Sequence, residues 1–341
     1  MSAHAFASVT FASPRVAARS RTRGSAKPTR LAAAADGSAS ESGFTDASVI
    51  ANNAASLDGK LRTLVVGVED SQGDERLNHR NPTSGTLFKH KRWLDEYTVP
   101  GQEVTLVDLD SGKKCTCPIS VSPYRARATA PNTDVSVVEF LLDTDSDDGD
   151  ENFFAKAQPP NRLVVSAVTG VGFENPMFPL DFNLKAAVDN KHAIVLIAGG
   201  ARGIGPMRST LEWPIVASHA DKYPVTLFYL HAGAKESNGK SAAFVAEWDE
   251  WRGGGVAVVP LFGDDKNSNV FAVQSSIAGG APVECGGKGR KVLGNDSTNV
   301  TVLMAGLTRD ETKAMIAVFS DTHGVPKSNI LALPDKRGVK K

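Results

Sequence analysis

A glycine-rich turn is the feature of this sequence best suited to chemistry. Residues 199–206 read Gly-Gly-Ala-Arg-Gly-Ile-Gly-Pro and directly follow the apolar run 193–198. Glycines let a ligand approach the backbone, and a helix starting at such a turn offers N–H groups and a partial positive charge to a phosphate. Pro206 suits the first helical position. The spacing is not G-x-G-x-x-G, so a tight packing turn is the alternative to a phosphate site.

Buried strands and helices must position this turn. The run 193–198 (AIVLIA) is typical of a strand buried on both faces of a parallel sheet. Further strands are expected at 225–230, 256–262, 300–305 and 330–333, and helices at 206–220, 242–252 and 309–322. This alternation predicts an α/β doubly wound parallel sheet over 186–341, with the turn at the carboxyl end of its first strand, where such sheets bind ligands. Residues 263–298 are expected to be a long loop or an insertion around one short helix.

The first half of the chain has short strand-like runs without helices, which predicts an antiparallel β-barrel over residues 46–185. The expected strands are 61–68, 103–109, 135–142 and 162–168. Residues 36–58, rich in Ala, Ser and Asn, are expected to form a linker. The acidic run 143–151 fails as a calcium loop because Gly149 falls one place late and Phe154 replaces the bidentate Glu. It is therefore expected to be a solvated loop.

Composition excludes several classes of protein. The 341 residues carry 38 basic and 38 acidic side chains. This zero net charge argues against a polybasic nucleic-acid binder. Three cysteines are too few for a disulfide framework. No apolar run reaches the roughly 20 residues of a membrane span.

The charge is unevenly distributed along the chain. Residues 1–35 contain six basic residues, many Ser and Ala, and no acid. This composition predicts an organelle transit peptide, chloroplast rather than mitochondrial, with a disordered basic tail as the alternative. We assign residues 1–45 to this segment and its linker, and expect the chloroplast stroma as the location. The remainder carries 32 basic residues (38 less these 6) against 38 acidic, a net charge of about −6.

The chain resembles the ferredoxin–NADP reductase superfamily in the order and spacing of several segments. In the second half these are 198–209 (AGGARGIGPMRS), 227–236 (LFYLHAGAKE), 302–315 (VLMAGLTRDETKAM) and 324–331 (GVPKSNIL). In the first half they are 97–106 (YTVPGQEVTL), 119–124 (ISVSPY) and 169–173 (TGVGF). The resemblance covers about residues 60–334, and is greatest to plant and algal chloroplast FAD/NAD(P)-binding oxidoreductases of unassigned substrate.

This resemblance implies that the barrel binds FAD, the α/β domain binds NAD(P)H, and hydride passes where the two rings meet. The residues it implies for the pyrophosphate are Gly199, Gly200, Arg202, Gly203, Gly205 and Pro206. Lys235, with Lys240, would meet a 2′-phosphate, which favours NADPH, with solvated surface lysines as the alternative. Ala305 and Gly306 would lie beside the nicotinamide. The flavin would contact Ser120, Ser122, Pro123 and Tyr124, with Thr169 and Gly170 near its phosphate. Neither a catalytic acid or base nor a metal site is predicted.

Three departures from the family pattern bear on this function. The flavin motif Arg-x-Tyr-Ser/Thr is replaced by residues 115–118 (Cys-Thr-Cys-Pro), and the Cys-Gly near the nicotinamide by residues 305–306 (Ala-Gly). Arg202 is an extra residue in the phosphate turn, where it could bind pyrophosphate bidentately or block it. Candidates to replace the lost phosphate contact are Arg125, Arg127 and Lys114. A second hypothesis is therefore a reductase-like nucleotide-binding or regulatory module without flavin.

The final electron acceptor is not indicated by the sequence. Ferredoxin is possible but not favoured, because a chain of net charge about −6 would not steer toward an acidic protein. A local basic patch could still do so, formed by Lys89, Lys91, Arg92, Lys113 and Lys114.

Overall fold

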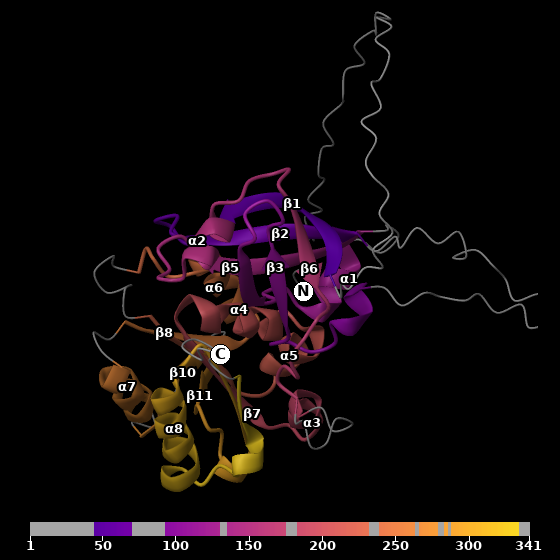
Figure 1. Ribbon diagram of the computed structural model, residues 1–341. Coiled ribbons are helices and arrows are strands. Elements are labelled where there is room, and N and C mark those ends of the chain that lie inside the picture. The colour runs from indigo at the N-terminus through magenta and orange to yellow at the C-terminus, as the bar shows by residue number, and fades with distance from the viewer. Residues whose placement is uncertain are drawn as a thin grey trace, which may run out of the picture. The chain divides into compact units, whose positions relative to one another are not determined.

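The computed structural model describes residues 44–69, 93–129, 135–174, 183–231, 239–262, 266–278, 283–285 and 288–333. The expected transit segment, Lys235, and the Lys89, Lys91 and Arg92 part of the basic patch lie outside these residues. Figure 1 shows the antiparallel strands of the first half and the parallel strands and helices of the second.

Six antiparallel strands form the first sheet, in the order β4-β3-β6-β1-β2-β5. They are β1 (Phe44–Ala54), β2 (Leu61–Glu69), β3 (Glu103–Val107), β4 (Lys114–Pro118), β5 (Val135–Asp143) and β6 (Arg162–Ser166). The two end strands meet just beyond β4, where Ile119 bridges Phe140 and the Ser120 N–H donates to the Glu139 carbonyl at 2.8 Å. This closure confirms the predicted barrel. Its core includes Leu64, Leu106 and Phe140, all fully buried.

Two sequence expectations in this half are wrong. Residues 44–54 are not linker but strand β1, which pairs with both β2 and β6. Its small polar residues hid the strand, because only Ala47 and Val49 point into the core. The acidic run is not only a solvated loop, since helix α2 (Gly149–Ala155) begins within it. The Asp148 carboxylate caps this helix by accepting from the N–H groups of Asp150 and Glu151.

Five parallel strands form the second sheet, in the order β13-β12-β7-β8-β9. They are β7 (Ala193–Gly199), β8 (Val225–Leu230), β9 (Val256–Leu261), β12 (Val300–Ala305) and β13 (Ile330–Ala332). Each predicted apolar run forms one of these strands. β7, β8 and β12 read as continuous apolar runs because both faces of the sheet are covered.

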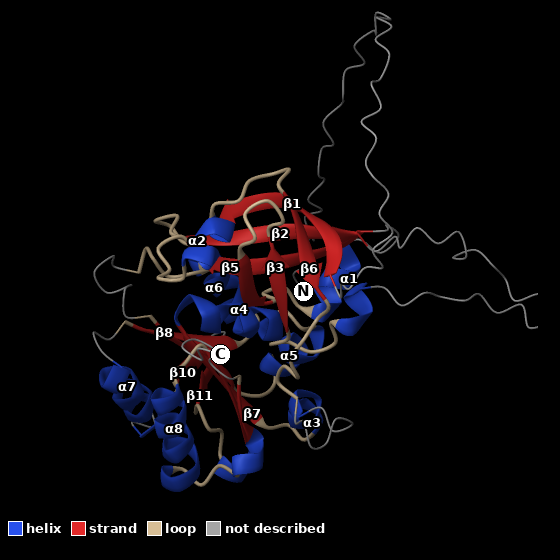
Figure 2. Ribbon diagram, viewed as in Figure 1, coloured by secondary structure: helices blue, strands red, loops and turns tan. Residues whose placement is uncertain are grey.

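Helices cover both faces of this sheet, as the secondary-structure colouring in Figure 2 shows. Ile194, Leu196 and Ala198 of β7 point to one face, and Val195 and Ile197 to the other. The first face packs against α3 (Asn183–Asp189), α4 (Gly200–Leu211), α5 (Pro214–Ala220) and α6 (Trp248–Gly253). The second packs against α7 (Lys266–Ala278) and α8 (Arg309–Ala317), which a π-helical turn extends to Thr322.

The segment 263–298 differs from its expected form of a loop around one short helix. Its helix α7 has 13 residues. A two-stranded hairpin follows, formed by β10 (Val283–Cys285) and β11 (Lys288–Arg290). In the barrel half a further short helix, α1 (Pro123–Thr129), follows the segment 119–122.

The strand order of the parallel sheet reverses between β7 and β12, and this is the position where doubly wound sheets bind ligands. The backbones of the two strand ends touch there. A Cβ atom on Gly306 would overlap the carbonyl oxygen of Gly199, and a Cβ on Gly203 would overlap that of Ala305. Glycine at 203 and 306 therefore brings the turn after β7 against the turn after β12.

We predict that Gly203→Ala lowers the free energy of unfolding by about 1–3 kcal/mol, because the new methyl group would overlap backbone that cannot move independently. Gly253→Ala is the matched control. Its Cβ would meet nothing within 4 Å at the end of α6, so stability should stay within about 1 kcal/mol of the original. Urea unfolding of both variants provides the comparison. Equal midpoints would contradict the close packing.

Candidate functional site

The glycine turn forms the start of helix α4. Gly199 is the N-cap, with extended backbone and no side-chain cap, and Gly200 begins the helix with φ of 60° and open space where a Cβ would stand. The helix therefore starts six residues earlier than expected, and Pro206 lies inside it rather than at its first position. The uncapped first turn leaves N–H groups for an anion, as a phosphate turn requires.

Residues predicted to lie beside the nicotinamide are adjacent to this turn. Ala305 ends β12 and is buried, while Gly306 follows with φ of 72° and contacts Gly199. The tertiary structure thus joins two predicted segments that are more than 100 residues apart in sequence. Gly205 is on α4 and faces the barrel, where its Cβ position lies 3.3 Å from the Cβ of Ser120.

The guanidinium of Arg202 points to helix α2 of the barrel half. Its Nη2 lies 2.6 Å from Oε2 of Glu151 and 3.6 Å from Oδ2 of Asp148, and its Nε donates to the same Glu151 oxygen at 3.2 Å. The Glu151 side chain is only 4% exposed. Arg202 therefore links the glycine turn to the barrel.

The predicted flavin segment is mostly buried at the junction of the two halves. Ser120 and Ser122 are fully buried and Pro123 is buried, whereas Tyr124 is 60% exposed on α1. The Ser122 hydroxyl accepts from the Arg125 N–H at 3.1 Å. The hydroxyl of Ser120 has no hydrogen-bond partner within the described residues. An orphaned buried hydroxyl is uncommon in proteins and marks a place where a ligand atom could bond.

Thr169 and Gly170 lie at the edge of the barrel. Thr169 exchanges two backbone hydrogen bonds of 2.9 Å with Glu103, and Gly170 turns the chain with φ of 80°. The carbonyl of Gly170 accepts from the Gln102 amide at 3.3 Å. These contacts place both residues beside the start of strand β3.

Two of the three cations considered for a flavin phosphate are held by protein groups. Arg125 pairs with Glu212 at 2.5 Å. Arg127 donates to three main-chain carbonyls, those of Leu94, Tyr97 and Pro123. The side chain of Lys114 is exposed on β4 and makes no hydrogen bond or ion pair with the described residues, so it is the cation of the three that could reach a ligand.

Cys115 and Cys117, at the positions where the resemblance implied a flavin motif, are buried in the barrel core. The hydrogen bond between the two thiols and their burial raise the pKa of Cys117 well above its ordinary value. A thiol in this state is a poor nucleophile and a poor metal ligand at neutral pH. No cluster of His, Cys, Asp and Glu within the described residues is arranged to hold a metal ion.

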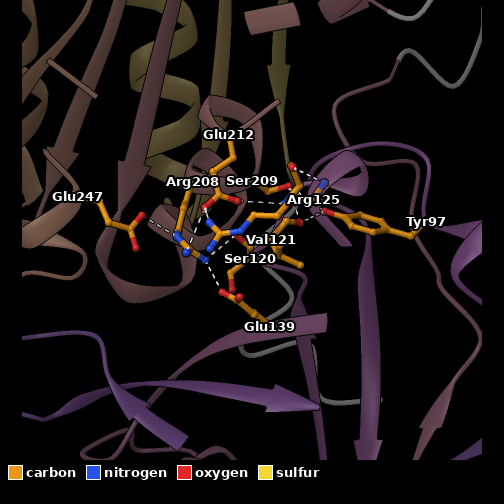
Figure 3. Close-up of polar contacts among 10 residues, drawn as sticks. Tyr97, Ser120, Val121, Arg125, Glu139, Arg208, Ser209, Glu212 and Glu247 are labelled. Atoms are coloured by element: carbon orange, nitrogen blue, oxygen red, sulfur yellow. Dashed lines mark hydrogen bonds and ion pairs between the residues drawn. The ribbon is translucent and has the colours of Figure 1, made fainter. Parts of the chain in front are cut away.

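A buried charge cluster joins the two halves, and the sequence analysis missed it (Figure 3). Arg208 of α4 donates to Glu139 of β5 at 2.6 Å and to Glu247 at 2.8 Å, and it lies 3.1 Å from Glu212. Its guanidinium also stacks over the ring of Phe244, 4.7 Å from the centroid. Burial opposes the charge, but the three carboxylates overcome this and raise the pKa of Arg208. For Glu212, burial raises the pKa more than the two guanidiniums lower it.

Tyr97 adds a second polar link across the same junction. Its hydroxyl bonds to the carbonyl of Val121 at 2.6 Å and to the hydroxyl of Ser209 at 2.8 Å. Burial raises the pKa of Tyr97 well above 10, so it stays neutral. Two sequence signals pointed to this junction: the charge of Glu139 inside an apolar strand, and the four-residue spacing of Arg208 and Glu212.

One histidine among the described residues lies at the carboxyl edge of the sheet. His231 follows β8 and stacks on Tyr229, with ring centroids 5.7 Å apart. Burial lowers the pKa of His231, so the neutral imidazole is favoured.

Within the part of the chain that the structure describes, no helix has the length and apolar character of a membrane span.

The arrangement fits two dinucleotide-type ligands. The uncapped helix start and the adjacent Gly306 turn suit the phosphates and the ring of a nicotinamide cofactor. On the barrel side the Lys114 side chain is exposed, whereas the Ser120 hydroxyl is buried and has no hydrogen-bond partner within the described residues.

The fold is shared with solved reductases. The chain superimposes on a cytochrome P450 reductase from Amycolatopsis with a TM-score of 0.52 at 15% identity, covering 85% of this chain and 69% of that one. It superimposes on the ferredoxin–NADP⁺ reductase of Plasmodium falciparum with a TM-score of 0.50 at 12% identity, covering 85% and 95%. A ferredoxin reductase of carbazole 1,9a-dioxygenase matches at 0.50 and 14%, covering 85% and 68%.

These neighbours define the class of fold, a ferredoxin reductase-like antiparallel barrel followed by an α/β domain with a parallel sheet. No protein-family model matches the chain, and no curated protein matches it. At this level of identity the likeness establishes the fold, and the roles of individual residues rest on their geometry.

We predict that Arg208→Met lowers the free energy of unfolding by about 3–5 kcal/mol, because three carboxylates would then face one another without their shared cation. Arg252→Met is the matched control. Arg252 pairs with the exposed Asp249 at 3.0 Å and lies over the Trp248 ring at 5.8 Å, and its loss should change stability by less than about 1 kcal/mol. Chemical denaturation of both variants measures the difference. Similar losses would show that Arg208 does not hold the junction.

We predict that His231 contributes to acid sensitivity. Its pKa is lower in the folded state than in the unfolded state, so the stability linked to it is lost as pH falls through about 6.5. His231→Gln should therefore lose less stability between pH 7.5 and 5.5 than the unmodified chain. Thermal unfolding at both pH values gives the result, and an unchanged difference would rule out this role.

Proposed function

We propose that the chain is an oxidoreductase that transfers hydride or electrons between NAD(P)H and an unidentified acceptor through FAD. The observation that carries the proposal is the meeting of the glycine turn with Gly306 at the strand-order reversal, directly beside the barrel. A ligand at this position would contact both halves of the molecule. The reductase-like fold supports the same function.

In this proposal the first turn of α4 binds the pyrophosphate of the nicotinamide cofactor. Gly200 leaves the backbone accessible, Gly199 packs against Gly306, and the helix start contributes partial positive charge. Ala305 and Gly306 would lie beside the nicotinamide ring. Lys235 and Lys240 are proposed to favour NADPH by meeting its 2′-phosphate.

On the barrel side, Ser120 would hydrogen-bond the flavin and Lys114 would neutralise its phosphate. A bound flavin supplies the hydride chemistry, and the protein supplies position, charge and exclusion of water. Arg208 and Tyr97 hold the two halves together, so the two binding surfaces keep a fixed relation. None of these residues is needed as a catalytic acid or base.

We further propose that the protein works in the chloroplast stroma, based on the basic, acid-free composition of residues 1–35. Its acceptor is not expected to be ferredoxin. Within the described residues Lys113 and Lys114 lie beside the acidic helix start of α2, where Asp150 accepts from the Lys114 N–H. Nearby carboxylates would weaken attraction to an acidic protein.

A second function is favoured by a separate observation. The motif positions 115–118 place two thiols in the core, and Arg125 and Arg127 are committed to protein partners. A nucleotide-binding regulatory or interaction module without flavin would need none of these groups free. The two functions differ in whether the purified protein carries flavin.

We predict that the purified full-length protein shows visible flavin absorbance or gains it on addition of FAD, and that NADPH bleaches it faster than NADH. Lys114→Gln should weaken FAD binding about tenfold through the loss of a charge-assisted contact. Lys113→Gln is the matched control, because Lys113 lies over the Phe153 ring at 4.8 Å and should leave FAD binding unchanged.

Absorbance titration and stopped-flow mixing distinguish the two functions. Colourless protein that takes up neither FAD nor FMN, yet binds NADPH, would favour the flavin-less module. Flavin that neither NADPH nor NADH bleaches would reject hydride transfer.

A further inference from the structure

Arg202 joins the phosphate turn to an acidic site on the other half of the molecule. It lies in the first turn of α4, where a dinucleotide phosphate is proposed to bind, but two of its nitrogens donate to a single oxygen of Glu151. Its side chain is 25% exposed. Its charge is therefore directed to α2 rather than to the open side of the turn.

The acidic partner is built rigidly into the barrel half. Glu151 also accepts from the Ser146 hydroxyl at 2.9 Å and from the Asp143 N–H at 3.3 Å. Asp148, 3.6 Å from Arg202, is fixed by capping α2. Because these carboxylates are held by other groups, the movable member of the pair is the arginine side chain.

We propose that Glu151 lowers the affinity of the glycine turn for dinucleotide phosphates by holding the guanidinium of Arg202 away from them. A phosphate must break the contact between Arg202 and Glu151 before it can pair with the guanidinium. This inference rests on the proposed function and adds a regulation of the same site. An extra arginine in a phosphate turn would otherwise be expected to strengthen anion binding.

Electrostatics sets the direction of the effect. While Arg202 neutralises Glu151, a phosphate arriving at the turn meets an ion pair rather than a free cation. Removing the Glu151 charge both frees the guanidinium and removes a repelling carboxylate, so anion affinity must rise. Coupling is reciprocal, and a bound phosphate must weaken the contact between Arg202 and Glu151 by the same factor.

The test is the affinity of the full-length protein for NADPH and for inorganic pyrophosphate, measured by calorimetry. Glu151→Gln should tighten both by about fivefold, a typical strength for one partly buried ion pair. Asp145→Asn is the matched control. It removes one charge from the same acidic run, but Asp145 pairs with Lys60 at 2.7 Å, so its effect should stay below about twofold.

A second variant isolates the role of Arg202. In an Arg202→Gln background, Glu151→Gln removes only the repelling carboxylate and frees no guanidinium, so it should tighten binding less than it does in the unmodified protein. Thermal unfolding of every variant confirms that it is folded.

Three outcomes overturn the proposal in distinguishable ways. If Glu151→Gln binds like the control, Glu151 does not restrain Arg202. If it binds more weakly, Glu151 orients Arg202 for the phosphate instead of withholding it. If the unmodified protein and all variants fail to bind NADPH, NADH or pyrophosphate, the nucleotide site of the proposed function fails with it.

Discussion

Arg208 carries a positive charge into the junction between the barrel and the α/β half, and much of the molecule is organised around satisfying it. Its side chain is 5% exposed, and its carboxylate partners come from β5, from the end of α4 and from the segment before α6. A buried charge is tolerated only when it is paired and hydrogen-bonded. Since Glu139 belongs to the barrel and Glu247 to the other half, this requirement fixes the two halves together.

The same junction explains why the glycine turn has its particular sequence. Helix α4 must approach β12 on one side and the barrel segment 119–122 on the other. Gly203 permits the first approach and Gly205 the second. The turn therefore contains glycines for two reasons, close packing and access to its uncapped N–H groups, and the two interpretations offered by the sequence are compatible.

Charge at the glycine turn is balanced by neighbouring side chains rather than across the whole surface. Arg202 is opposed by Glu151 and Asp148, which belong to an acidic run that the sequence presented as a mere loop. The chain is close to neutral as a whole, yet a phosphate approaching this turn encounters fixed carboxylates within a few ångströms. Short-range pairing of this kind, rather than net charge, governs affinity at such distances because salt screens the rest.

Structural features set by local sequence patterns could be predicted, whereas features set by contacts between distant residues could not. Local sequence determines the parallel strands and the place of the glycine turn. A strand covered by helices on both faces of the sheet must be apolar along its length, as β7 is. β1 escaped prediction because Ala47 and Val49 alone carry its buried face. The helix start at Gly200 was not predicted, because a proline is most often found in the first turn of a helix, which placed the expected start at Pro206. Pro206 instead lies inside helix α4, whose position is set by packing against other elements.

What only the tertiary structure decided is which charges meet. Arg208 and Glu139 are 69 residues apart, and Arg202 and Glu151 are 51 apart. No local pattern specifies such a pair, because each partner is chosen by the docking of one half on the other. The sequence by itself determined the fold class and the place of the turn. The packed junction determined that Arg202 serves the barrel's carboxylates and that the hydroxyl of Ser120 is left without a partner.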